Sequence, residues 1–228
     1  MDFNLQKFYF ENADLLDKIP SKDKLKLQKG ILKKKIKSGK LIYKEGARPK
    51  GVYILKKGKV KIFQSNQDGR KQIMYIYVKG ELFGYRPILC GEFHPVTAVA
   101  LEDCSYDFIP TNYFIECLKQ SIELNNVLLI SLSHEFSVWV NNISVFAQYP
   151  VKSRIALGLL VLQEKYRMNG ELSEVNLSRE DLASYVGTVK ETAVRVLQEY
   201  KKNGIIETQG RKIRILKPEK LKAMVNFY

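Results

Sequence analysis

The stretch from residue 177 to 206 constrains the fold most, because two amphipathic helical patterns, LSREDLASYV and TVKETAVRVLQEYKKN, are separated only by Gly187. Ser178 followed by Asp181 is typical of a helix N-terminus, where a serine side chain accepts a hydrogen bond from a free backbone amide. Glycine adopts positive φ without steric cost, so Gly187 allows a sharp turn. Two helices joined this tightly predict a helix–turn–helix.

The second helix of the pair is predicted to begin at a capping box formed by Thr188 and Glu191, and to end before Gly204. Its apolar stripe consists of Val189, Ala193, Val196, Leu197 and Tyr200. Its outward positions are Lys190, Glu191, Val194, Arg195 and Gln198. Arginine suits guanine, glutamate suits a cytosine amino group, and an apolar side chain suits a thymine methyl group. The face therefore predicts contact with DNA bases, although capping alone also accounts for Glu191.

Helical and strand patterns flank this pair. RIALGLLVLQEKY, residues 154–166, is predicted to form a buried helix. GIIETQGRKIRIL, residues 204–216, is predicted to form a hairpin that turns at Gly210. A helix, a helix–turn–helix and a hairpin in this order predict a winged helix–turn–helix.

Residues 41–109 have a different character, with short runs of β-branched and aromatic residues such as GVYILKKG and KQIMYIYV separated by glycine-containing turns. Asp68-Gly69 lies between two such runs and is typical of a hairpin turn. This spacing predicts a small antiparallel barrel or jelly roll. The chain as a whole is therefore predicted to be α+β.

Residues 121–148 carry a heptad repeat. Ile122, Leu129, Phe136 and Ile143 recur every seven residues, and Asn125, Leu132, Trp139 and Phe146 occupy the interleaved positions. The pattern predicts one long helix with an apolar seam, which Pro150 ends. The seam can pack within its own chain or on a partner helix, and the pattern favours a two-fold dimer.

Composition bears on which function classes remain. The three cysteines, Cys90, Cys104 and Cys117, form no CxxC pair and are expected to be small buried residues, and the two histidines have no ligand cluster around them. No metal is therefore expected. We find no nucleophile–base pair and no phosphate loop, so catalysis is not expected either. No apolar run approaches 18 residues and the N-terminus is unlike a signal peptide, which predicts a cytoplasmic protein without a membrane span.

The formal net charge is +14, but it is unevenly distributed. Residues 18–61 hold 17 Lys or Arg against two acids, Asp23 and Glu45, whereas residues 149–228 hold 15 against nine acids. A basic block is either a solvated face or a site of phosphate contact, and the sequence leaves both open.

The order of these parts, and VGTVKETAVRVL in particular, resembles the cyclic-AMP receptor protein/Fnr (Crp/Fnr) family of bacterial transcription regulators. The resemblance extends to the glycines of GARPKGVYILKKGKV and GELFG and to the Glu191-Thr192 pair followed by Arg195. It implies a cyclic-nucleotide-binding-like β-roll over residues 1–120, a dimerisation helix over 121–149 and a winged helix–turn–helix over 150–228. It also implies RNA polymerase as a partner.

On this basis the base-contacting residues are expected to be Lys190, Glu191, Val194 and Arg195 in each subunit of a homodimer bound to double-stranded DNA. The expected phosphate contacts are Ser178, Arg179, Thr192, Lys201, Arg211 and Lys212. The remaining alternative is a ligand-binding regulatory module that acts through protein–protein contacts.

The family's cyclic-nucleotide cassette is altered in this chain. Cyclic-nucleotide-binding members carry a glutamate where this chain has Tyr85 and an arginine where it has Val96, and Trp139-Val140 replaces their Thr-Ser pair. A buried phosphate without its arginine costs several kcal/mol, so cyclic AMP is not expected as an effector. The candidate pocket for any other effector comprises Gly84, Tyr85, Arg86, Thr97 and Trp139, where Arg86 either binds an anion or bonds within its loop. The oxygen-sensing members use an N-terminal cysteine cluster, and this chain has no cysteine before Cys90.

Overall fold

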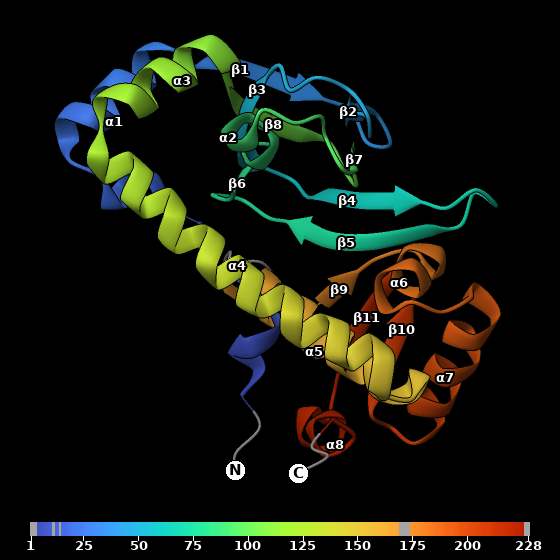
Figure 1. Ribbon diagram of the computed structural model, residues 1–228. Coiled ribbons are helices and arrows are strands. Elements are labelled where there is room, and N and C mark those ends of the chain that lie inside the picture. Colours follow the sequence, from blue (N-terminus) through green and yellow to red (C-terminus); the bar gives the residue numbers. More distant parts are fainter. Residues whose placement is uncertain (1–3, 11, 14, 169–173, 226–228) are drawn as a thin grey trace. The chain divides into compact units, whose positions relative to one another are not determined.

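The computed structural model describes residues 4–10, 12–13, 15–168 and 174–225 (Figure 1). The chain divides into two compact units. Residues 11–64 and 74–134 form one, here called the barrel unit, and residues 1–10, 65–73 and 135–228 form the other, the winged-helix unit. Within the described part of the chain, no helix is both long enough and apolar enough to cross a membrane.

Eight strands in two four-stranded sheets form the barrel. Their bounds are β1 Leu32–Ile36, β2 Leu41–Tyr43, β3 Gly51–Lys57, β4 Val60–Ser65, β5 Lys71–Tyr77, β6 Leu82–Phe83, β7 Thr97–Ala100 and β8 Cys104–Pro110. The strand orders are β1-β8-β3-β6 and β2-β7-β4-β5. Gly69 has φ +76° in the turn between β4 and β5, which confirms the predicted hairpin. The β-rich region begins at β1, earlier than the predicted residue 41.

Strand β3 shows how the barrel acquires two apolar sides. Successive side chains of a strand point to opposite faces, so Val52 and Ile54 share one face while Tyr53 and Leu55 share the other. All four side chains are buried. Val52 and Ile54 belong to the core cluster under the helices, and the Tyr53 ring contacts aromatic rings from other strands. Strand β3 is therefore covered on both faces.

Helices cover the outer face of this sheet. They are η2 Leu15–Lys18, α1 Ser21–Lys29, α2 Arg86–Cys90, α3 Thr111–Gln120 and the first turns of α4 Ile122–Gln148. Their apolar side chains form one core cluster with β3, in which Leu27, Phe114 and Leu124 are at most 1 % exposed. The α1 and α3 helices are joined by a hydrogen bond from the Tyr113 hydroxyl to the Lys26 carbonyl, 2.6 Å long. Cys104 and Cys117 are buried as expected, but Cys90 is exposed, so that expectation is wrong for Cys90.

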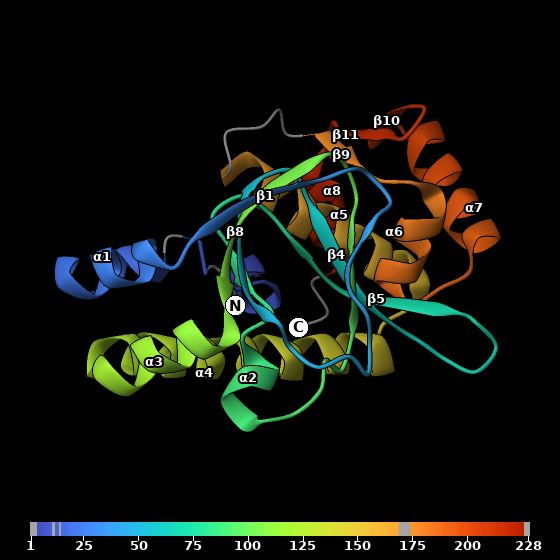
Figure 2. The same ribbon diagram turned by 90° about the horizontal axis from the view of Figure 1, so that it is seen from above.

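Strand β1 is an edge strand. It pairs only with β8 in the sheet order, and Figure 2 shows it running along β8. Leu32 through Lys35 are exposed. Lysines on an exposed edge discourage pairing with another chain, which gives the sequence LKKKI a structural reason.

The winged-helix unit follows the predicted order. Its elements are η1 Leu5–Phe8, α5 Val151–Met168, β9 Glu174–Asn176, α6 Arg179–Val186, α7 Lys190–Lys202, β10 Ile206–Gln209, β11 Lys212–Ile215 and α8 Pro218–Ala223. The sheet order is β10-β11-β9, with Gly210 at φ +55° in the turn between β10 and β11. Helix α5 packs closely on α6, because a Cβ at Gly158 would lie 2.8 Å from the Val186 side chain. The predicted winged helix is confirmed.

Helix α4 runs without a break from Ile122 to Gln148. The first heptad series is exposed along it: Ile122 at 74 %, Leu129 at 64 %, Phe136 at 70 % and Ile143 at 65 %. Large apolar side chains exposed in a row are unusual in a chain that acts alone and mark interaction surfaces. The exposed fractions show that these four side chains are left uncovered by the described residues of the chain.

Candidate functional site

Helix α6, which precedes the turn, begins and ends as the sequence predicts. The Ser178 hydroxyl accepts a hydrogen bond from the Asp181 amide at 2.9 Å and donates to the Asp181 carboxylate at 2.8 Å. Gly187 ends α6 with φ 67° and ψ 48°, a left-handed conformation that glycine favours. A Cβ on Gly187 would lie 3.1 Å from the Phe146 ring, so the close approach of α4 also favours glycine here.

The start of α7 differs from the prediction. Its N-cap residue is Val189, which is 50 % exposed and makes no side-chain cap, so the predicted Thr188–Glu191 capping box and the inward position of Val189 are both wrong. The reason lies in the preceding turn. The backbone amide of Thr188 donates a hydrogen bond to the backbone carbonyl of Ala183 at 2.9 Å, so Thr188 belongs to the C-terminal end of α6. Glu191 is therefore not needed as a cap.

The remaining apolar stripe of α7 is buried as predicted: Ala193, Val196, Leu197 and Tyr200 are at most 3 % exposed. Tyr200 also donates a hydrogen bond from its hydroxyl to the Lys152 carbonyl at 2.8 Å, which ties α7 to α5. With this face fixed, the opposite face must point to solvent. The α6–α7 pair is visible in both views (Figures 1 and 2).

The outward side chains at the start of α7 are available for a partner. Lys190, Glu191 and Arg195 are exposed, and Val194 is half-buried beside them. Within the described residues, no hydrogen bond or ion pair engages the side chains of Lys190, Glu191 or Arg195. The start of α7 thus presents two cationic side chains, one carboxylate and one apolar side chain to solvent.

The expected phosphate-contacting residues surround this turn, but some are already engaged. Arg179 is half-buried and donates from Nη2 to the Gly210 carbonyl at 3.1 Å, which ties the start of α6 to the turn of the β10–β11 hairpin. Lys212 lies 3.5 Å from Glu174. Lys201 and Arg211 are exposed, whereas Ser178 and Thr192 are half-buried.

Glu174 is a residue that sequence reasoning missed. It accepts two hydrogen bonds from Arg214, at 3.0 Å from Nε and 2.6 Å from Nη2, in addition to the contact with Lys212. The hydrogen bonds from Arg214 hold the pKa of Glu174 below its ordinary value. Because β9 pairs with β11, this carboxylate sits beside the cations of the hairpin. A three-residue strand that follows a long helix offers no sequence signal for that pairing.

The interior of the barrel is occupied by aromatic side chains from both sheets. The Tyr53 and Phe83 rings stack with centroids 5.0 Å apart, and Phe83 lies at the same distance from Tyr77. Tyr43 lies 5.6 Å from Tyr53 and stacks flat on His94 at 3.8 Å. All five side chains are at most 8 % exposed. Sequence analysis did not single out these residues, although the alternation in GVYIL and MYIYV could have indicated inward rings.

Burial controls the protonation of this cluster. It raises the pKa of Tyr53 to about 12 and that of Tyr43 well above its ordinary value, so these hydroxyls stay neutral. Burial also lowers the pKa of His94 to about 4, and His94 Nε2 has no hydrogen-bond partner among the described residues. The imidazole ring therefore stays neutral near pH 7.

Four of the candidate effector residues belong to the barrel unit, where they take different positions. Gly84 has φ +80°, and a Cβ there would lie 2.8 Å from the Tyr53 ring. Arg86 donates to the Tyr77 hydroxyl at 3.1 Å, while Tyr85 is fully buried in the core cluster under the helices. The Thr97 hydroxyl accepts from the Glu45 amide at 3.1 Å. The fifth candidate, Trp139, lies on α4 and belongs to the winged-helix unit.

Comparison with known proteins agrees with this architecture. Residues 33–121 match the cyclic nucleotide-binding domain, and residues 153–224 match the Crp-like helix-turn-helix domain. Among curated relatives, the transcriptional activator protein Anr of Pseudomonas protegens is 27 % identical over 217 residues, which cover 94 % of this chain and 84 % of Anr.

Two solved structures show the same fold. FixK2 from Bradyrhizobium japonicum matches with a TM-score of 0.75 and 21 % identity, over 85 % of this chain and 96 % of FixK2. A Crp/Fnr-family transcriptional regulator from Thermus thermophilus matches with a TM-score of 0.70 and 24 % identity, over 85 % of this chain and 98 % of that protein. The chain is a member of the Crp/Fnr family of DNA-binding transcription regulators, which are not enzymes.

Proposed function

We propose that this regulator acts as a homodimer that binds an inverted-repeat DNA site through α7 and that cyclic AMP is not its effector. The observation that carries the proposal is the free polar face at the start of α7. Lys190, Glu191 and Arg195 are exposed and have no partner in the part of the chain that the structure describes, on a helix whose opposite face is buried. A helix docked in the major groove contacts bases with its N-terminal residues.

The division of roles follows from side-chain chemistry. Arg195 donates two hydrogen bonds to a guanine, and Glu191, which does not cap its helix, is free to accept from a cytosine amino group. Lys190 reaches a base or a phosphate, and Val194 contacts a thymine methyl group. Lys201 and Arg211 contact phosphates, which fix the register of the protein on DNA without distinguishing sequences.

The exposed seam of α4 supports the dimer. Its four apolar positions, Ile122, Leu129, Phe136 and Ile143, are each more than half exposed in the single chain. A second copy related by a two-fold axis presents the same seam and covers it. Two copies of α7 then address two half-sites about one helical turn apart. The resemblance to the Crp/Fnr family further implies that the bound dimer contacts RNA polymerase.

The barrel interior supports independence from cyclic AMP. The positions at which cyclic-nucleotide-binding members carry their glutamate and arginine hold Tyr85 and Val96, and Tyr85 is buried among the helices. Arg86 is the nearby cation, but it donates to Tyr77. The rings of Tyr53 and Phe83 fill space between the two sheets. A cyclic phosphate would meet aromatic rings in place of its arginine.

Selection of bound sequences from random DNA, with and without cell extract, tests the proposal. We expect an inverted repeat, and a dependence on extract would reveal an effector. Calorimetry with millimolar cyclic AMP should give no binding heat. A salt titration separates DNA binding from the protein-contact alternative, because phosphate contacts make affinity fall steeply with salt. Failure to enrich any sequence would leave the protein-contact function as the better explanation.

A further inference from the structure

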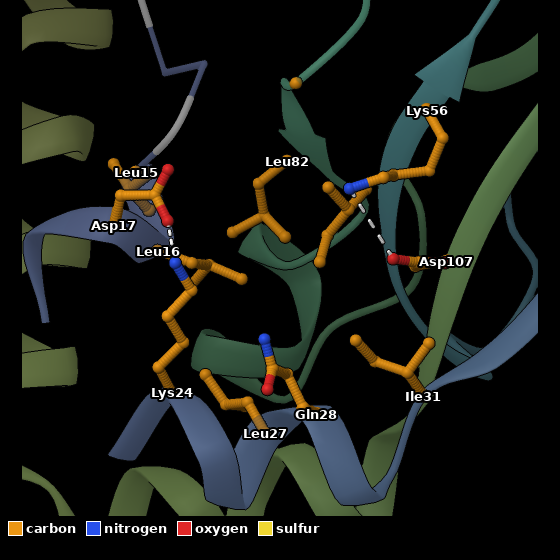
Figure 3. Close-up of a pocket in the computed structure, with 12 residues that line it drawn as sticks. Leu15, Leu16, Asp17, Lys24, Leu27, Gln28, Ile31, Lys56, Leu82 and Asp107 are labelled. Atoms are coloured by element: carbon orange, nitrogen blue, oxygen red, sulfur yellow. Dashed lines mark hydrogen bonds and ion pairs between the residues drawn. The ribbon is translucent and has the colours of Figure 1, made fainter. Parts of the chain in front are cut away.

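A hollow of about 270 Å³ lies on the outer face of the barrel sheet, under helix α1 (Figure 3). Its floor belongs to the core cluster: Leu27 and Leu82 are each 1 % exposed and Ile54 is 9 % exposed. Leu16 and Ile31 are partly buried and form the walls. Small-molecule sites are concave and mostly apolar, with roughly 300–1,000 Å³ of space, so this hollow is slightly smaller than the lower limit of that range.

Two lysines and two carboxylates form the polar rim of this hollow. Lys24 pairs with Asp17 on one side, and Lys56 lies 3.8 Å from Asp107 on the other. Figure 3 shows these two pairs on opposite sides of Leu82. Both carboxylates are thus already matched by a cation. The side chain of Lys56 is 56 % exposed, so its ammonium group can turn toward a ligand.

A second, wider hollow of about 630 Å³ adjoins the first and shares Gln28, Ile31, Lys56 and Asp107 with it. Lys33 and Lys35 of β1 line this second hollow. They are paired in register with Asp107 and Ser105 of β8, so they lie two residues apart on the same face of the strand. The two adjoining hollows, together called the groove, have their apolar floor at the α1 end and the lysines of β1 at the other end.

Edge protection does not account for all of these cations. Lysines on β1 discourage pairing along the edge, but Lys24 comes from α1 and Lys56 from the inner strand β3. Five lysines from three elements, with Lys34 of β1 as the fifth, therefore line the two hollows against two carboxylates. Lys33 and Lys35 have no hydrogen-bond or ion-pair partner among the described residues. The excess positive charge favours an anion.

We propose that this groove binds a small organic anion with an apolar body, in the form of an alkyl carboxylate or an alkyl phosphate. The apolar body covers Leu27 and Leu82 in the first hollow. The acid group accepts hydrogen bonds from Lys33 and Lys35 in the second. The site lies outside the barrel interior and consists only of residues of the barrel unit, so it does not depend on the proposed DNA contacts.

Titration of the protein with octanoate and with octyl phosphate tests this proposal. Calorimetry and the methyl NMR shifts measure the binding. We expect shifts at Leu27, Ile54 and Leu82, and an affinity that rises roughly fourfold for each further buried methylene group along a series of shorter and longer chains. The ratio of the two affinities distinguishes a carboxylate from a phosphate ligand. Acetate and inorganic phosphate, which lack the apolar body, should bind at least about 100-fold more weakly.

Two variants locate the ligand. Lys33→Gln with Lys35→Gln should weaken binding of octanoate at least tenfold, and Leu16→Trp, which fills the hollow, should abolish it. The matched control is Lys22→Gln with Lys29→Gln, which removes the same charge from exposed positions of α1 outside the groove and should bind normally. Circular dichroism confirms that each variant is folded.

Several outcomes would overturn the proposal. They are the absence of binding by any alkyl anion, equal binding by the two lysine double variants, and shifts at Tyr53 and Phe83 instead of Leu27 and Leu82. Equal affinity for acetate and octanoate would also exclude the apolar contact. If a polyglutamate peptide shifted Lys33 and Lys35 while octanoate shifted nothing, the groove would belong to an acidic protein partner.

Discussion

In helix α7 the polar side chains of Lys190, Glu191 and Arg195 face solvent and have no partner among the described residues, whereas in the barrel the rings of Tyr53 and Phe83 are packed against each other. Each region matches a family model, the Crp-like helix-turn-helix domain for the first and the cyclic nucleotide-binding domain for the second. The two regions thus differ in how their side chains are satisfied: the polar groups of α7 are exposed to a partner, whereas the rings of the barrel pack on one another.

The proposed dimer seam of α4 offers the largest test of this comparison, because in the proposed function two copies of α7 contact two half-sites together. Phe136→Glu combined with Ile143→Glu should yield a monomer and weaken specific DNA binding by about 10²–10⁴-fold, since the second half-site then no longer adds avidity. Analytical ultracentrifugation and DNA titration measure the two effects. Ser144→Glu, one position outside the seam, is the matched control. A wild-type monomer at micromolar concentration would contradict the prediction.

The second test opens the barrel interior. Tyr53→Ala removes a ring that is 5 % exposed and contacts Phe83, Tyr43 and Phe108, so it should lower the free energy of unfolding by about 3–5 kcal/mol. Urea unfolding measures the loss. The control is Phe93→Ala, because Phe93 is 50 % exposed and its removal should cost less than about 1 kcal/mol. A similar loss for both variants would mean that the interior rings are not a packed core.

The third test uses the pH dependence of His94. Its pKa falls from 6.5 to about 4 on folding because of burial, so the unfolded chain binds the proton more readily. The contribution to stability is complete above pH 6.5 and is lost as the pH falls toward 4, by at most about 3 kcal/mol. His94→Phe keeps a ring on Tyr43 and should remove this dependence. If the slope of the unfolding free energy against pH between 6.5 and 4 were the same in His94→Phe as in the wild type, His94 would not be the group responsible.

The fourth test addresses base contact by α7. Arg195→Ala should cost about 1–3 kcal/mol per half-site and relax the preference at one base pair. Lys201→Ala, on the same helix, should instead weaken binding to all sequences alike. Binding to a panel of single-substitution sites distinguishes the two patterns. If Arg195→Ala left affinity and preference intact, α7 would not be the base-contacting helix.

The smallest expected effect comes from Glu174, which forms ion pairs with Arg214 and Lys212 of the β10–β11 hairpin. Glu174→Gln should release Arg214 and Lys212 for phosphates, raise affinity for all DNA sequences a few-fold at low salt, and steepen the salt dependence. Glu207→Gln is the matched control, because Glu207 is 63 % exposed and lies 4.0 Å from Arg214. Equal gains in both variants would indicate a general charge effect rather than release of these two cations.

The sequence alone was sufficient for the elements whose pattern is local. The Ser178 cap, the Gly187 turn and the heptads of α4 each depend on residues within a few turns of one another, where helix geometry fixes which side chains share a face. The same local reasoning placed Lys190, Glu191 and Arg195 on the outside of α7. It failed at Thr188, because the amide of that residue is used by the preceding helix.

Tertiary structure decided what joins residues distant in the chain. Tyr43 meets His94, and Glu174 meets Arg214, only because strands far apart in sequence become neighbours. The basic block at 18–61 likewise acquired a place only when α1, β1 and β3 came together around Leu82. Periodicity records which way a side chain points, but not what it meets, because the partner is chosen by the packing of whole elements.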